Sequence, residues 1–285
     1  MTLMSSRQVV LSGIISLLVL VSSIAGLTDS RVYDQETQNW LLQAQGQDVG
    51  NLIAVVVLVV AAVGTRRGSY RAGLVWLGTL MYLVYAFIVY AMAVHLNHLF
   101  LVYVAVLGLC AWSIIFGFGP LGRQDVGYPT GRVRPAAAWV IIGTGALFAA
   151  LWLSELVPAL VTGETPASLA EAGLWVNPIH VIDLSIALPA FIITGVAALS
   201  RREHGLFWLA PWLVFSVLMG TSIIAAMVLI ASTGDTGALA PAVMVGLVVA
   251  ASLVAAWSYL RRVDADPAGR EPFTSPRRGT PIVGT

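Results

Sequence analysis

LFWLAPWLVFSVLMGTSIIAAMVLIAS, residues 206–232, contains no charged side chain. Its length exceeds the roughly 20 residues that carry an α-helix across a bilayer. Lipid offers no hydrogen-bond partners to backbone groups, so a run of this kind must be helical. The whole chain is 58% hydrophobic and 10% charged, whereas about a quarter of a soluble domain is charged. The composition therefore predicts an all-α polytopic membrane protein.

Apolar runs of similar character predict eight spans, at about 8–27, 49–64, 73–94, 98–118, 137–160, 179–200, 206–232 and 238–260. The first run, with Arg7 before it and Ser23-Ile24-Ala25 near its end, resembles a cleavable signal. Its apolar stretch is long for a signal peptide, so we expect it to be retained as the first span.

The arginines predict the orientation. With eight spans, every arginine except Arg31 falls on one side of the membrane. Cytoplasmic loops are enriched in basic residues, so we expect a multi-pass protein of the cell's inner (plasma) membrane with both termini in the cytoplasm.

Several function classes are excluded by what the chain lacks. It contains no lysine, so a Schiff base with retinal or pyridoxal has no amine to form on. Cys110 is the single cysteine, which excludes an intrachain disulfide. No phosphate-binding loop, nucleophile elbow or dinucleotide fingerprint occurs, and nothing supports nucleic-acid binding.

A short polar signature occurs twice. Gln45-Gly46-Gln47-Asp48 and His180-Val181-Ile182-Asp183 each precede an Arg-Arg pair, and the Asp lies 18 positions before the first Arg in both copies. The near-copies Gly73-Leu-Val-Trp-Leu77 and Gly205-Leu-Phe-Trp-Leu209 follow. The match predicts two parallel halves of four spans each, related by an axis along the membrane normal.

The halves define the expected domain organisation. Residues 1–118 form the first repeat, with an external loop at 28–50 in which Trp40-Leu41-Leu42 suggests an amphipathic surface helix. A cytoplasmic connector occupies 119–136, the second repeat 137–262, and a disordered cytoplasmic tail 263–285.

The ionisable residues other than arginine gather at the external ends of the spans. The candidates for a polar site are His180, Asp183, Asp48, His95 and Glu155, with Gln45, Asn97 and His98 in secondary roles. Ionisable groups at membrane depth are costly, so they are functional candidates. Asn177 as N-cap and Pro178 at the first helical position place His180 and Asp183 on one face of span six.

Two kinds of chemistry fit this set. Imidazole and carboxylate ligands suit a divalent metal such as zinc or iron. Alternatively, Asp183 could orient His180 as a catalytic proton-transfer group. The structural alternative is that Asp48 serves the helix dipole, that the two histidines of the 95–98 turn face water, and that Glu155 bonds a neighbouring helix.

Three stretches carry a family resemblance: Asn177-Pro-Ile-His-Val-Ile-Asp-Leu184, Val94-His-Leu-Asn97 and Gln45-Gly-Gln-Asp48. They resemble a family of bacterial eight-span integral membrane proteins to which no activity is attached. The resemblance covers most of spans two to seven. It implies the same eight-span architecture and leaves the activity open.

The sequence therefore favours a membrane-embedded enzyme that acts on a lipid-soluble substrate at a His/Asp site near the outer leaflet. A small-solute or ion transporter that uses the same residues as an outer gate is one alternative. A non-catalytic partner subunit, bound to another membrane protein or to further copies of itself, is the other. Convergence of His180, Asp183, Asp48 and His95 would favour a metal site, and a continuous polar cavity would favour transport.

Overall fold

The computed structural model describes residues 3–263, and every element in it is helical. Eight helical segments are long and apolar enough to cross a membrane, which confirms the expected all-α, eight-span architecture. In chain order the elements are α1 (Ser6–Thr28), η1 (Ser30–Val32), α2 (Gln38–Arg66), α3 (Tyr70–Ala93), α4 (Phe100–Gly122), α5 (Val133–Thr162), α6 (Ala167–Ala172), α7 (Pro178–Ile182), η2 (Asp183–Ala187), α8 (Leu188–Leu199), α9 (Glu203–Ser232), η3 (Thr236–Ala238) and α10 (Leu239–Leu260).

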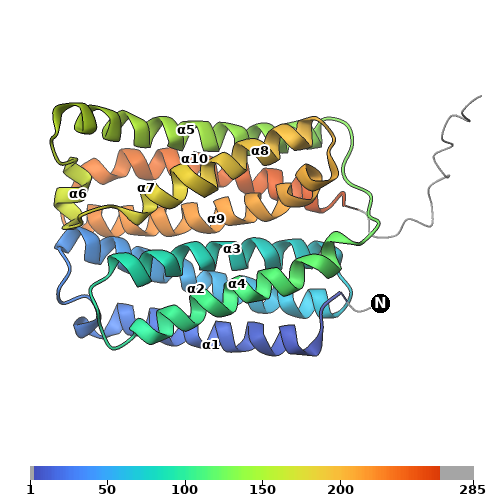
Figure 1. Ribbon diagram of the computed structural model, residues 1–285, viewed down its shortest axis with the longest axis horizontal. Helices are drawn as coiled ribbons and strands as arrows, with labels where there is room; N and C mark the ends of the chain where they lie inside the picture. The colour runs from blue at the N-terminus through green and yellow to red at the C-terminus, as the bar shows by residue number, and fades with distance from the viewer. Residues whose placement is uncertain (1–2, 264–285) are drawn as a thin grey trace, which may run out of the picture.

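The spans form two bundles of four that lie side by side, with α1–α4 below and α5–α10 above in Figure 1. In the first bundle α1 packs on α2, α2 on α3, α3 on α4 and α4 on α1. In the second, α5, the continuous span α7–η2–α8, α9 and α10 pack in the same order. The shared neighbour order agrees with the internal repeat, which stays a prediction.

Helix α9 joins the two bundles by packing along both α2 and α3. Small residues allow the close approach of α2: a Cβ atom added to Gly46 would lie 2.3 Å from the backbone N and Cα of Ala226. At Gly50, one turn further, an added Cβ would lie 2.4 Å from Ser222 Cβ. Small residues four positions apart are typical of tightly packed membrane helices.

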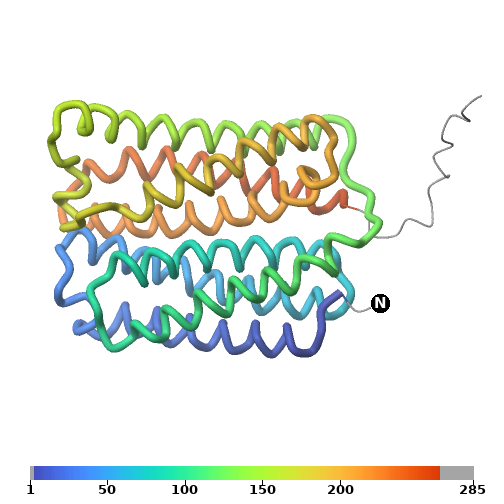
Figure 2. Tube along the Cα trace, viewed as in Figure 1, coloured from blue at the N-terminus to red at the C-terminus, as the bar shows by residue number. Residues whose placement is uncertain are grey.

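The two ends of the molecule differ in chemistry. We call the end with Arg66, Arg123 and Arg202 the arginine end, and the end with His95 and His98 the histidine end. The chain trace in Figure 2 places the start of α1 and the end of α10 at the arginine end. Toward this end α3 packs closely on α9: a Cβ atom added to Gly78 would lie 2.5 Å from the Pro211 carbonyl O and 2.8 Å from Val214 Cβ.

Helix α2 differs most from the expectation. It begins at Gln38 instead of near residue 49, because the Thr37 hydroxyl caps it by accepting from the Trp40 backbone N–H (3.2 Å). Trp40 does not lie on a membrane surface: its ring is buried, and its Nε1 donates to the carbonyl of Ala93 (2.6 Å). Asp48 consequently lies deep inside a helix and not at its mouth.

Smaller differences concern the connections. The link between the bundles is shorter than the expected 119–136, because α4 continues to Gly122 and α5 starts at Val133. A short helix, α6, occupies the link between α5 and α7, where the sequence suggested none. From residue 264, the expected tail lies outside the described residues.

Candidate functional site

Asp183 begins a wide turn in the first half of the membrane span Pro178–Leu199. The Asn177 side chain caps α7 by accepting from the Ile179 backbone N–H (2.9 Å), as expected. From Asp183 the helix widens into the π-helical turn η2, in which the Leu188 N–H donates to the Asp183 carbonyl. Pro189 explains the widening, because it has no N–H to donate and its ring would collide with an α-helical carbonyl four residues earlier. Turns of this kind often occur at functional sites.

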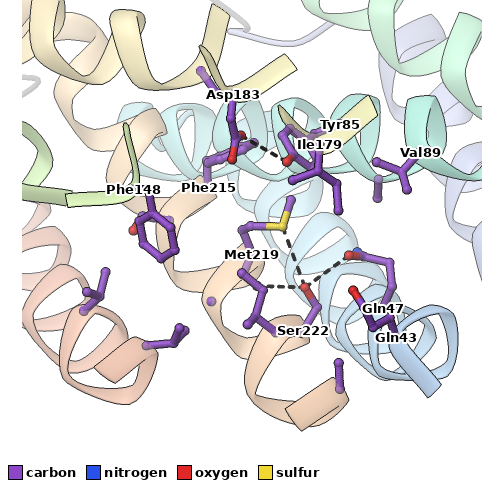
Figure 3. Close-up of a pocket in the computed structure, with 18 of the residues that line it drawn as sticks. Gln43, Gln47, Tyr85, Val89, Phe148, Ile179, Asp183, Phe215, Met219 and Ser222 are labelled. Carbon is purple, nitrogen blue, oxygen red and sulfur yellow. Dashed lines mark hydrogen bonds between the residues drawn. The ribbon is translucent and has the colours of Figure 1, made fainter. Parts of the chain in front are cut away.

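Two donors from different helices hold the Asp183 carboxylate. Tyr85 of α3 donates its hydroxyl to Oδ1 (3.0 Å), and Trp152 of α5 donates Nε1 to Oδ2 (2.8 Å). Figure 3 shows the first of these bonds at the edge of a cavity. The Asp183 carboxylate thus links the two bundles, and no basic side chain in residues 3–263 forms an ion pair with it.

The cavity beside Asp183 has a volume of about 350 Å³ and lies between the bundles, toward the histidine end. Apolar side chains form most of its wall, and Asp183 is the one side chain charged at neutral pH among the lining residues that the structure describes. Its aromatic lining consists of Trp40, Tyr85, Tyr90, Phe148, Trp152, Phe191 and Phe215. Cavities of this size and character bind small molecules.

The cavity exists because the second bundle is loosely packed at the histidine end. In α5 the last buried residue is Gly145, and none of residues 146–162, all of them described, is buried. In α10 the first buried residue is Val245. At this end α5 and α10 therefore bury few side chains against their neighbours, and a space remains among these two helices, α9 and the span α7–η2–α8.

A polar patch forms the opposite wall of the cavity. The Ser222 hydroxyl of α9 donates to Gln47 Oε1 of α2 (3.2 Å), as Figure 3 shows. The Gln47 amide donates in turn to the Tyr82 hydroxyl (2.6 Å), which donates to Asn51 Oδ1 (3.1 Å). These groups are satisfied by each other, so the patch offers oriented neutral dipoles and no charge.

A smaller polar pocket of about 250 Å³ adjoins the cavity at the histidine end, and we call it the vestibule. Gln43 and Met227 line both spaces. The vestibule is also lined by the exposed acids Glu171 and Asp235 and, within the described part of the chain, by no basic residue.

Asp48 forms a separate cluster within the first bundle. It is 1% exposed, and its carboxylate accepts from the hydroxyls of Tyr33 (2.7 Å) and Tyr90 (2.8 Å). Burial raises the pKa of the Tyr33 phenol, and the negative charge of Asp48 raises it further, so Tyr33 stays protonated and donates. Asp48 does not line the cavity, and its bonds fasten the loop that contains Tyr33 onto α2 and α3.

His180 and Glu155 lie near Asp183 but make other contacts. The His180 ring packs against the Trp152 ring (centroids 4.7 Å apart), and its Nε2 is buried with no hydrogen-bond partner in the described residues. Glu155 Oε1 accepts from the Ser168 backbone N–H (3.3 Å). No hydrogen bond joins the side chains of His180 and Asp183 within residues 3–263, so the expected His/Asp acid–base pair is not formed.

The 95–98 turn lies at the surface, and its side chains contact neither Asp183 nor His180 in the described residues. His95 Nδ1 lies 3.0 Å from Glu36 Oε1, and His98 Nε2 lies 3.7 Å from Asp29 Oδ2. Asn97 donates to the Val32 carbonyl (3.1 Å), which ties the turn to the loop after α1. Both histidine side chains are about half exposed, at 53% for His95 and 49% for His98, but each also lies beside a carboxylate, which the sequence did not suggest.

The expectation of a shared metal site is therefore not supported. In the part of the chain that the structure describes, no three His, Cys, Asp or Glu side chains are grouped so as to hold a metal ion. Asp48 is enclosed by tyrosines, His95 faces Glu36, and Asp183 faces Tyr85 and Trp152. Spacing along the chain brought the candidates to one end of the bundle, but not to one point.

A glutamine that the sequence did not single out, Gln47, lines the cavity. Gln45 is half-buried and forms no side-chain hydrogen bond among the described residues, whereas Gln47 lines the cavity and bonds across the bundle interface. Trp152, which donates to Asp183, was not among the candidate site residues either. An amide within a membrane span was the available signal for Gln47, because such groups need partners on neighbouring helices.

The chain matches no protein-family model, no curated protein and no solved structure.

Proposed function

We propose that this integral membrane protein binds a lipid-soluble small molecule in the cavity between its two bundles, with the Asp183 carboxylate as the polar contact. The observation that carries the proposal is the cavity itself: its volume is about 350 Å³, most of its wall is apolar and aromatic, and Asp183 is the one carboxylate among the described residues that line it. A few placed polar groups in an otherwise apolar cavity are the usual features of a small-molecule site.

The arginine distribution supports an orientation for this site. If the arginine end faces the cytoplasm, the cavity lies at the depth of the outer leaflet. The sparse packing of α5 and α10 at that depth supports entry of a molecule dissolved in the bilayer.

The enzyme and transporter hypotheses make different demands on the cavity. An enzyme acting on a lipid-soluble substrate has Asp183 as its acid–base group, because His180 is not among the lining residues. A transporter needs a path to the other end, and there α3 and α9 are in close contact: a Cβ atom added to Gly78 would lie 2.5 Å from the Pro211 carbonyl O. Binding is the part of both hypotheses that the geometry supports.

Equilibrium dialysis tests the proposal. The probe is radiolabelled 2,2-dimethylpropylbenzene, which is neutral and apolar, and the protein is held in lipid nanodiscs with empty nanodiscs as background. Wild-type protein should retain the probe above that background. Ile223 lines the cavity, so I223W fills it with a larger side chain and should abolish the excess.

The matched control is I224W. Ile224 is the next residue on α9 and does not line the cavity, so this variant adds the same side chain elsewhere. It should retain the probe as wild type does. Full retention by I223W would show that the probe binds outside the cavity and would refute the proposal.

A further inference from the structure

Among the described residues, the Asp183 carboxylate has hydrogen-bond donors but no counter-charge. Its two donors, the Tyr85 hydroxyl and the Trp152 indole N–H, are neutral groups. The three ion pairs found in residues 3–263 involve Asp29 and Glu36 and lie outside the spans. An isolated charge in an apolar medium is costly unless a charge of opposite sign accompanies it.

The side chains around Asp183 suit a positive charge. Trp152 and Tyr85 bond to the carboxylate, and Phe215 packs edge-on against Tyr85 with centroids 5.6 Å apart. Phe148, whose centroid lies 6.3 Å from that of Trp152, also lines the cavity. Aromatic faces attract ammonium groups, most strongly where water is excluded.

The approach to the cavity is lined by acidic side chains, which have the same negative sign of charge as the Asp183 carboxylate. Glu171 and Asp235 line the vestibule, which shares Gln43 and Met227 with the cavity. Acidic groups at the mouth of a cleft raise the local concentration of cations and their rate of association. This observation is independent of the bonds made by Asp183.

We infer that the cavity selects an organic cation, a quaternary or protonated amine with apolar substituents, whose charge pairs with Asp183 while its substituents fill the apolar and aromatic space. The inference rests on the proposed function and specifies its ligand class. The cavity holds the volume of on the order of ten water molecules, at about 30 Å³ each. A single ammonium group with one ring or a short chain fits that volume, whereas a two-chain lipid does not.

A pair of probes of equal shape separates charge from shape. Benzyltrimethylammonium differs from 2,2-dimethylpropylbenzene in having a positive nitrogen where the latter has a carbon. In the dialysis assay described above, D183N should lower the affinity for the cation at least tenfold and change that for the neutral probe by less than about twofold. Asp48 is buried in the other bundle and does not line the cavity, so D48N is the matched control and should leave cation binding unchanged.

Each outcome decides between the two proposals. If D183N binds the cation as wild type does while I223W loses both probes, the cation inference is refuted and the cavity proposal stands. If I223W retains both probes, the cavity proposal fails. Retention of the neutral probe by D183N shows that this variant is folded.

The vestibule gives a second test that does not depend on D183N folding. Glu171 and Asp235 are exposed, so E171Q/D235N leaves the buried structure intact. Association of benzyltrimethylammonium should slow at least twofold in this variant, and added salt should reduce the difference from wild type. An unchanged association rate would overturn the assignment of the vestibule as the entry for a cation.

Discussion

Replacement of Gly46 by alanine tests the close packing of α2 on α9. The added Cβ would lie 2.3 Å from two backbone atoms of Ala226 and 2.5 Å from its Cβ. Backbone atoms cannot rotate aside as the end of a long side chain can, so the helices must separate. Overpacking costs up to about 3 kcal/mol. Alanine has a higher helix propensity than glycine by about 1 kcal/mol, so the free energy of unfolding should fall by about 2 kcal/mol in total.

Gly13 of α1 provides the control, because an added Cβ there meets no atom within 4 Å. G13A therefore gains propensity without a clash and should be as stable as wild type or slightly more so. The free energy of unfolding is measured in mixed micelles by titration with a denaturing detergent, followed by tryptophan fluorescence. If G46A proves as stable as G13A, the backbone contact between α2 and α9 is not as described, and the reasoning fails.

Three further predictions concern other parts of the molecule. Y33F removes the 2.7 Å hydrogen bond from Tyr33 to the Asp48 carboxylate and should lower the free energy of unfolding by about 1.5–3 kcal/mol. An ordinary surface substitution changes this free energy by about 0.5 kcal/mol, so a smaller change in Y33F would contradict the buried cluster. Hydrogen bonds from Arg31 lower the pKa of Asp29 from 3.8 to about 2. The stabilisation from this pair is therefore present above about pH 4 and is lost as the pH falls toward 2. NMR titration of the Asp29 carboxyl should show a midpoint near 2 in the wild type and a midpoint closer to 3.8 in R31Q. The Cys110 thiol is buried, so a membrane-permeant maleimide should label it only after unfolding, and rapid labelling of the folded protein would exclude its place in the core.

The membrane spans could be read from the sequence because lipid imposes one strong constraint on every apolar run. The sequence misplaces the start of α2, because the polar residues Gln45, Asp48 and Asn51 resemble the end of a membrane span. In the structure Asp48 and Asn51 are buried, because Tyr33, Tyr90 and Ser23 supply hydrogen bonds. These partners come from distant parts of the chain, and local sequence does not reveal them.

Only part of the candidate site could be predicted from the sequence. Asp183 could be identified, because a carboxylate within a membrane span is energetically costly and is therefore a functional candidate. Its partners could not, because Tyr85 and Trp152 reach it from α3 and α5 and are typical of spans anywhere. The cavity carries even less local signal: it arises from the spacing of α5 and α10, whose apolar residues look the same whether they face lipid, a ligand or another helix.

The π-helical turn at Asp183–Ala187 sets the angular phase of the whole span. A π turn takes up one residue more than an α turn, so this span has one residue more than a regular helix with the same two faces would need. Closure of this turn to α-helical geometry, with no residue lost, would rotate the preceding segment by about 100° and move it outward by about 1.5 Å. The carboxylate would then turn away from Tyr85 and Trp152, while every apolar residue after Pro189 kept its place. The direction of the Asp183 carboxylate thus depends on the geometry of one turn, and loss of one residue between 184 and 187 would let a regular helix keep both faces.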